Sequence, residues 1–465
     1  MLPSTSTPPP ATKQQDKPGG FRWVVCTLLF FAITINYLDR QLLSILKKPL
    51  SDELGWTDAD YGWITAAFSF AYAFGYLVAG RTMDWIGVKR GLPLAVFLWS
   101  TAAVAHGLCA WIEPAAQITV KYPWFSWANS AFAVMTLTLP MTAAGFILAR
   151  VALGLTQGGA FPGAVKTVAE WFPPKERALA TGWFNAGSNV GAVLCLVLVP
   201  VIFAHLGWQK TFYVTGATGF VWLLAWWFLY EKPEKHPRVS PGELAHIQSG
   251  EPVVEQKTSE PKVSVPWLSL LRYRAVWAYI AASILAGPAW GVYQSFMPDF
   301  LHKRFHLSLQ ETGTWSALFF AVAMIGGVLG GWFAGVLMAR GWTINAARKT
   351  ALLACALSVV PVFLAPFAGT VWLTVIIVGI AGSAHQGWSA NLYSVVGDTM
   401  PKQAVSSVVG LGGFVSYLAG GFVNGITGEI LQRTGSYVPV FAYISGMYLL
   451  SLLLVHVLVP RIGRT

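Results

Sequence analysis

The chain has 465 residues, of which 55% are hydrophobic and only 11% are charged, and its formal net charge at pH 7 is +11. Because an ordinary soluble domain carries about 25% charged residues, this composition excludes a soluble globular protein and indicates an integral membrane protein. The four cysteines all fall in apolar runs. They indicate neither a disulfide framework nor a metal site, and we expect them to be packing residues.

The N-terminal 20 residues are rich in Pro, Ser, Thr and Lys, which predicts a disordered cytoplasmic tail. The apolar run that follows has no small-residue cleavage site, so we interpret it as a retained membrane span and not as a signal peptide. Because about 20 apolar residues cross the hydrocarbon of a bilayer, we expect twelve spans. Their predicted ranges are 22–47, 58–80, 91–112, 139–166, 178–204, 209–230, 273–301, 311–338, 350–368, 370–396, 405–431 and 438–459.

Lysine and arginine are distributed unevenly over the loops between these spans. If both termini are cytoplasmic, most of the basic loop residues fall on the cytoplasmic side, as expected for a membrane protein. The positive net charge is therefore a signal of topology and does not indicate nucleic-acid binding.

The longest polar segment divides the chain into two sets of six spans. A faint internal repeat agrees with this division, since Pro173–Gly182 before the fifth span resembles Pro401–Gly410 before the eleventh. Two six-helix halves around a site at the bilayer midplane are the design of many secondary transporters. We predict an all-α membrane protein with a tail 1–20, an N-terminal half 21–230, a central cytoplasmic loop 231–272, a C-terminal half 273–460 and a cytoplasmic tail 461–465.

Asp39 and Arg40 stand next to each other in the apolar stretch FFAITINYLDRQLLSIL of the first span. Adjacent helical residues point about 100° apart, so the two side chains face different partners. An ionisable side chain inside a membrane is by default a functional hypothesis. We predict that Arg40 holds a substrate carboxylate, because the planar guanidinium matches its shape. The alternative is a buried charge network that locks helix packing.

The loop between the second and third spans, GRTMDWIGVKR, combines glycines that permit a tight turn with charges that can exchange ion pairs. On composition alone it could be any charged loop. Its spacing resembles the signature gating loop of the major facilitator superfamily, and a degenerate copy without the acidic residue begins at Gly330. The residues of this gating loop are Gly80, Asp84, Gly87, Lys89 and Arg90.

Three further segments carry a closer resemblance. NYLDR in the first span, the block 149–192 through the fourth and fifth spans, and AHQGWSANLYSVVGD in the tenth resemble the anion:cation symporter family of this superfamily. Within that family the chain is most similar to bacterial hexuronate transporters. The resemblance implies import of glucuronate, galacturonate or a related sugar acid together with protons, across a bacterial inner membrane. It also implies that the first-span arginine, Arg40, lies at the substrate cavity.

Gln157 departs from the pattern of the resembled family. There the matching position is commonly a glutamate that is paired with an arginine, here Arg150, and that is implicated in proton coupling. Glutamine cannot ionise. Three alternatives stay open: Asp39 alone carries the proton, the protein is a proton-independent facilitator or exchanger, or it is coupled poorly. We favour Asp39 as the remaining proton site.

Neutral polar and aromatic side chains are expected to recognise the hydroxyl groups of the substrate in the same cavity. Trp290 and Gln294 are four residues apart, as are His385 and Ser389, so each pair can share a helical face. Interhelical packing is an equally reasonable role for any one of them. The candidates are Tyr37, Tyr72, Asn185, Ser188, Asn189, Trp290, Gln294, His385, Gln386, Ser389 and Asn391.

The sequence has no Ser/His/Asp arrangement with a matching fold context, no metal-ligand cluster and no ATPase motif. We therefore predict a carrier that is not an enzyme, uses no cofactor or metal, binds no nucleic acid and works as a monomer in the lipid bilayer. The competing hypotheses are a carrier or exporter of another organic anion, such as an aldonate, aldarate or aromatic acid, and a solute sensor without transport.

Overall fold

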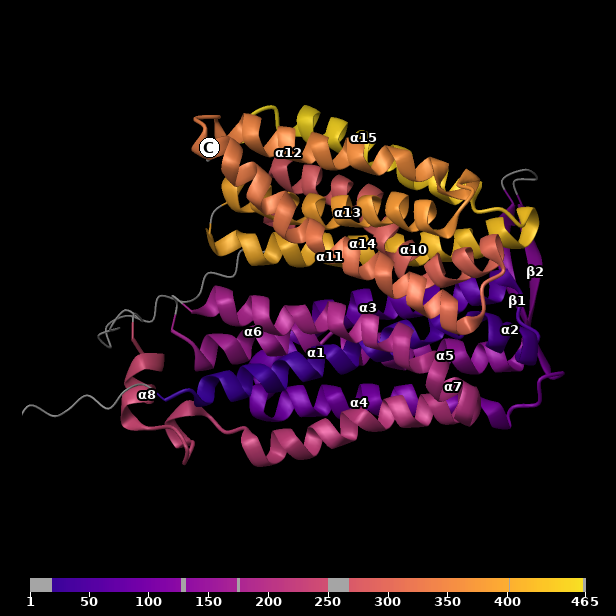
Figure 1. Cartoon of the computed structure of the whole chain (residues 1–465), viewed down its shortest axis with the longest axis horizontal. Coiled ribbons are helices and arrows are strands. Elements are labelled where there is room, and N and C mark those ends of the chain that lie inside the picture. Colours follow the sequence, from indigo (N-terminus) through magenta and orange to yellow (C-terminus); the bar gives the residue numbers. More distant parts are fainter. Residues whose placement is uncertain (1–18, 127–130, 174–175, 250–266, 401, 463–465) are drawn as a thin grey trace, which may run out of the picture.

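The computed structural model describes residues 19–126, 131–173, 176–249, 267–400 and 402–462. Its long helices run side by side in two bundles, one above the other in Figure 1. The first bundle holds α1 (Phe21–Ile45), α3 (Asp58–Ile86), α4 (Val88–Leu108), α5 (Met141–Gln157), α6 (Ala160–Trp171) and α7 (Arg177–Leu229). The second holds α10 (Arg274–Phe305), α11 (Leu309–Ala339), α12 (Ile344–Val359), α13 (Val371–Thr399), α14 (Lys402–Thr434) and α15 (Val438–Leu458).

Short elements distinguish the two ends of the paired bundles. α8 (Pro241–Ile247) lies at the end where α1 begins and α15 stops, which we call the linker end (Figure 1). α2 (Lys47–Leu54) and the strands β1 (Gln117–Ser126) and β2 (Ala131–Pro140) lie at the opposite end, the hairpin end. The remaining short pieces are α9 (Trp267–Leu270) and 3-10 turns at Cys109–Trp111, Pro233–Lys235 and Val360–Phe367.

Ten stretches of the described chain are long and apolar enough to cross a membrane, so the protein is a multi-pass membrane protein. One of them, Leu179–Leu229, has 51 residues and contains Gly207 at φ 73° and ψ 172°, a backbone conformation that suits glycine and interrupts the helix. The predicted spans 178–204 and 209–230 lie on either side of Gly207. The predicted span 311–338 lies within α11.

The region before the fourth span differs from the expectation. The predicted range 139–166 begins inside β2, the helix starts only at Met141, and the helical segment continues as α6 to Trp171. β1 and β2 pair antiparallel, with Gln117 opposite Pro140 and Ser126 opposite Ala131. An apolar run of this length fits a strand as well as a helix, so hydropathy alone does not separate the two.

Small residues allow the two bundles to touch at the hairpin end. A Cβ atom added to Gly62 of α3 would lie 2.8 Å from the Cα atom of Gly428 in α14, so neither position has room for a side chain. Glycine at such crossings lets helix backbones approach closely within a membrane. The close approach holds α3 against α14 and thereby fixes how the bundles meet beside the site.

Candidate functional site

A cavity of about 200 Å³ lies between the two bundles. α1, α3 and α5 form its wall on the first bundle, and α10, α13 and α14 form its wall on the second. Among the described residues that line it, the only side chains with a permanent charge are Arg40 and Arg150. The rest of the lining is aromatic, small or neutral polar, which suits a polar organic anion.

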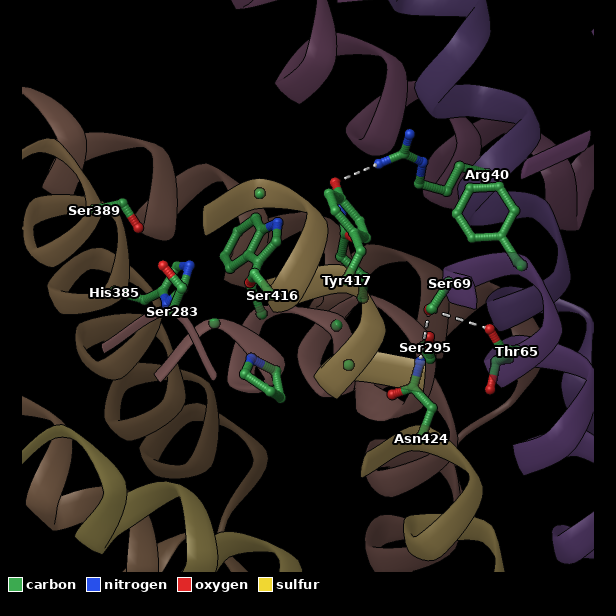
Figure 2. Close-up of a pocket in the computed structure, with 18 of the residues that line it drawn as sticks. Arg40, Thr65, Ser69, Ser283, Ser295, His385, Ser389, Ser416, Tyr417 and Asn424 are labelled. Atoms are coloured by element: carbon green, nitrogen blue, oxygen red, sulfur yellow. Dashed lines mark hydrogen bonds between the residues drawn. The ribbon is translucent and has the colours of Figure 1, made fainter. Parts of the chain in front are cut away.

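Arg40 is enclosed by aromatic rings. Its Cζ atom lies 4.6 Å from the ring centre of Tyr37, 5.1 Å from that of Phe68 and 4.5 Å from that of Tyr72. Its Nη1 donates to the hydroxyl of Tyr417 at 3.4 Å, as Figure 2 shows. Cation–π contacts of this kind hold the guanidinium in place.

Arg40 is 8% exposed, and among the described residues it forms no ion pair with a carboxylate. Its Nη2 has only a long contact, 3.5 Å, to Asn36 Oδ1, and its Nε atom has no hydrogen-bond partner in this part of the chain. A buried cation without a counter-anion is costly. The fork of donors is therefore available to an anion that enters the cavity.

Asp39 is not among the residues that line this cavity, although it is next to Arg40 in the chain. It is 2% exposed, and neither carboxylate oxygen has a hydrogen-bond partner among the described residues. The charge that acts on it is Arg150 of α5, whose Nη1 donates to the carbonyl of Arg40 at 3.4 Å. Asp39 and Arg150 thus attract each other at longer range than a direct ion pair.

Gln157 of α5 contacts α1 one turn before Arg40. It is fully buried, and its Nε2 donates to the Asn36 carbonyl at 3.1 Å, whereas its Oε1 has no partner in the described chain. The glutamine therefore connects α5 to α1 through one hydrogen bond. A carboxylate in its place could make that bond only when protonated.

The described lining residues of the second bundle include none with a permanent charge. The rings of Trp290 and His385 stack with centroids 5.3 Å apart and an interplanar angle of 5°, and His385 Nδ1 lies 2.6 Å from the hydroxyl of Tyr448. Figure 2 shows His385 with Ser283 and Ser389 on the far side of Tyr417 from Arg40. This arrangement places hydroxyl and imidazole groups opposite the guanidinium.

The predicted site residues separate into three groups. Arg40, Arg150, Trp290, Gln294, His385 and Ser389 line the cavity. Tyr37 and Tyr72 lie behind them against Arg40, as described above. The other five are not among its lining residues. Asn185 is exposed, and Asn189 and Gln386 are partly exposed. Ser188 donates to the Asn185 carbonyl at 2.7 Å, and Asn391 donates to the carbonyls of Gly330 and Gly387, each at 2.9 Å.

The predicted gating loop lies between α3 and α4 at the linker end. Gly87 joins the two helices at φ 80°, where glycine is favoured. The side chain of Lys89 pairs with Glu231, whose pKa this contact lowers, and Arg90 is exposed. Gly80 falls within α3, and the side chain of Asp84 lies outside the described residues.

Several cavity residues were not predicted from the sequence. They are hydroxyl, amide and phenol groups on α1, α3, α10 and α14: Gln41, Ser44, Thr65, Ser69, Tyr279, Ser283, Ser295, Ser416, Tyr417 and Asn424. Their recurrence on one face of α14, from Ser416 to Asn424 two turns later, was an available signal.

Hydrogen bonds and ion pairs join the bundles at the level of the cavity and at the hairpin end. Asn424 Nδ2 donates to Ser69 Oγ at 3.5 Å, and Gln41 Nε2 donates to the carbonyl of Gln294 at 2.9 Å. Nearer the hairpin end, Lys47 pairs with Asp299 at 2.6 Å. Between described residues, no such bond joins the bundles at the linker end. Within the described part of the chain, the polar contacts between the bundles therefore lie at the cavity and toward the hairpin end.

A two-bundle membrane protein with a polar cavity between its halves has the architecture of a membrane transporter. The chain matches the family model of the Major Facilitator Superfamily over residues 29–424, so it belongs to this superfamily. It is 28% identical to the hexuronate transporter of Escherichia coli K12 over 439 aligned residues. These residues cover 94% of this chain and 93% of that protein. These findings confirm the predicted resemblance and show that the chain is a transporter and not an enzyme.

Two more comparisons agree. The galacturonate transporter of Dickeya chrysanthemi is 30% identical over 314 residues, which cover 67% of this chain and 81% of that protein. Among solved structures, the D-xylose-proton symporter superposes with a TM-score of 0.68 at 13% identity, covering 94% of this chain and 97% of that chain. At this identity the superposition supports the fold alone.

Proposed function

We propose that this protein imports a hexuronate or a closely related sugar-acid anion by alternating access of its two bundles, with protons. The observation that carries the proposal is Arg40, a buried guanidinium at the cavity wall without a carboxylate partner among the described residues. The relatives named for hexuronate and galacturonate transport agree with an anion of this class.

In this proposal the substrate lies between Arg40 and the second bundle. Its carboxylate accepts hydrogen bonds from the guanidinium, and its hydroxyl groups reach toward His385, Ser389 and Gln294, which line the same cavity. The aromatic rings around Arg40 keep the fork fixed, so that little freedom is lost when the anion binds.

We propose twelve membrane spans, with both termini cytoplasmic in a bacterial inner membrane and the protein active as a monomer. The hairpin end then faces the outside, and the structure corresponds to a state that is closed to the outside. Import requires the bundles to separate at the hairpin end and to join at the linker end, where Lys89 and the gating loop lie.

Asp39 is the proposed proton site. Its oxygens have no hydrogen-bond partner in the described chain, and Arg150 is the cation that acts on it. When Asp39 takes up a proton, Arg150 loses that attraction and the cavity becomes more positive, which favours the anion. Release of the proton on the other side reverses the effect. The second candidate is a facilitator or exchanger, which Gln157 favours because it cannot ionise.

Uptake of radiolabelled glucuronate and galacturonate into proteoliposomes tests the proposal, with and without an inward proton gradient. We expect accumulation above equilibrium only with the gradient, and none in protein-free liposomes. Equilibration that ignores the gradient would support the facilitator. Absence of flux for every sugar acid would contradict the proposed substrate class.

A further inference from the structure

The charges of the cavity lie on one of its walls. Arg40 and Arg150 both belong to the first bundle, whereas the described lining residues of α10, α13 and α14 include no Lys, Arg, Asp or Glu. A bound anion therefore meets cations at one of its ends only.

Arg150 is less available to the substrate than Arg40. It is 3% exposed, and it faces the unpartnered carboxylate of Asp39 in the same buried layer. Whether Asp39 is ionised or protonated, Arg150 lies on the same wall as Arg40, so both cations stay at one end of the substrate. Arg40 is the guanidinium with unpaired donors on that wall.

The opposite wall can serve hydroxyl groups but not a second carboxylate. Ser283, Ser389 and His385 lie away from Arg40 across the cavity (Figure 2). The imidazole of His385 is stacked on Trp290, and its Nδ1 is already in contact with Tyr448. A carboxylate moved from water to this wall would lose its hydration without gaining a cation, which is strongly unfavourable.

Building on the proposed sugar-acid transport, we propose that the cavity selects six-carbon acids with one carboxylate and rejects those with a carboxylate at both ends. The substrate class is thus uronates and aldonates, and aldarates are excluded. The selecting residues are those of the uncharged wall, above all Ser283 and Ser389, together with Arg40, which holds the one carboxylate at the opposite wall.

Galactonate and galactarate are the matched probes. They share an open chain and the same hydroxyl configuration, and they differ only at carbon 6, which is a primary alcohol in one and a carboxylate in the other. Unlabelled galactonate and galactarate compete with labelled galacturonate for uptake into proteoliposomes at about pH 8, where an ordinary imidazole is uncharged.

We expect galactonate to compete at a concentration at least about tenfold lower than galactarate, a ratio that corresponds to about 1.4 kcal/mol. Equal competition by the two acids would overturn the selectivity while leaving sugar-acid transport intact. Failure of galacturonate itself to be taken up would instead count against the proposed function, so the two failures are distinguishable.

A cation added to the uncharged wall provides the complementary test. Ser389→Lys and, separately, Ser283→Lys each place an ammonium opposite Arg40, and we expect either variant to shift the competition ratio toward galactarate by about tenfold. The ratio is read within one variant, so a lower overall rate does not disturb it. If both variants are folded and keep the wild-type ratio, the wall does not select the charge of the substrate.

Discussion

Lys47 of α2 and Asp299 of α10 form a buried ion pair between the two bundles, with 2.6 Å between Nζ and Oδ2. They are 2% and 4% exposed. Asp58 accepts from Lys47 at 2.6 Å and from Lys303 at 2.7 Å, and the hydroxyl of Tyr437 donates to Asp299. Two cations and two carboxylates thus neutralise one another at the hairpin end, and separating the bundles there must break the pairs.

Asp299→Asn should loosen the hairpin end. Removal of Asp299 as a charge partner takes away the ion pair that joins Lys47 to the second bundle and leaves Lys47 with Asp58 of its own bundle. The state closed at this end is then less populated. The measurement is labelling of a cysteine at Ser44, a cavity residue, by a membrane-impermeant reagent added on the hairpin side. We expect labelling at least about tenfold faster than in the Ser44→Cys parent.

Arg433→Gln is the matched control for this variant. Arg433 pairs with Glu429 at 3.8 Å at the same end, but its side chain is 80% exposed, and exposed pairs contribute little. We expect unchanged labelling. Similar acceleration by Arg433→Gln and Asp299→Asn would mean that general loosening, and not the buried pair, controls access.

Asp39→Asn should remove the response to the proton gradient. The amide has nearly the size of the carboxyl group and mimics its protonated form, so binding of the anion persists while the proton can no longer be exchanged. In proteoliposomes we expect galacturonate exchange at equilibrium to continue and gradient-driven accumulation to disappear. Accumulation at the wild-type level would show that the proton is carried elsewhere.

Gln157→Glu should make transport depend more strongly on pH. A protonated glutamic acid can still donate to the Asn36 carbonyl that Gln157 now contacts at 3.1 Å, whereas the ionised form places negative charge against that oxygen. Uptake by the variant should therefore be close to wild type at low pH and fall below it as pH rises. A pH profile parallel to that of the wild type would contradict this interpretation.

At the linker end, we expect low pH to weaken the attachment of α8 to the first bundle. Burial raises the pKa of the Glu176 carboxyl, but hydrogen bonds from Arg22 and His246 lower it more, so that this pKa lies below its usual value of 4.5. This carboxylate ties α8 to α1 and α7, with Arg22 Nε at 2.9 Å and His246 Nε2 at 2.8 Å. A lowered pKa means that the stabilisation is present above about pH 4.5 and is lost as pH falls through the lowered value.

Protease sensitivity of the segment around α8 measures that attachment. We expect Glu176→Gln to be cleaved faster than wild type at neutral pH, because the amide lacks the charge that holds both partners. The two proteins should become alike below the lowered pKa. Equal cleavage at neutral pH would show that Glu243, which accepts from Arg22 at 3.0 Å, suffices to hold α8.

Arg40 could be selected from the sequence, because a charge inside an apolar span is costly and therefore indicates a functional residue. Tyr417 and Asn424 were not selected, because single polar residues are common in membrane helices, where packing and function look alike. The helical spacing from Ser416 to Asn424 was the one signal that pointed to them. The Lys47–Asp299 pair was also missed, since these residues belong to different bundles and only the tertiary structure brings them together. For β1 and β2, the apolar run was compatible with either type of element.

The most direct test of the central claim is the affinity of purified wild-type protein and of Arg40→Gln for galacturonate, measured by titration calorimetry. Loss of a buried, hydrogen-bonded charge partner costs about 2–5 kcal/mol, so we expect affinity to fall by about 30-fold or more. Arg40→Lys keeps the charge but lacks the planar guanidinium, so its affinity for galacturonate should lie between those of the wild type and of Arg40→Gln. Unchanged affinity in a folded Arg40→Gln protein would show that the carboxylate is held elsewhere.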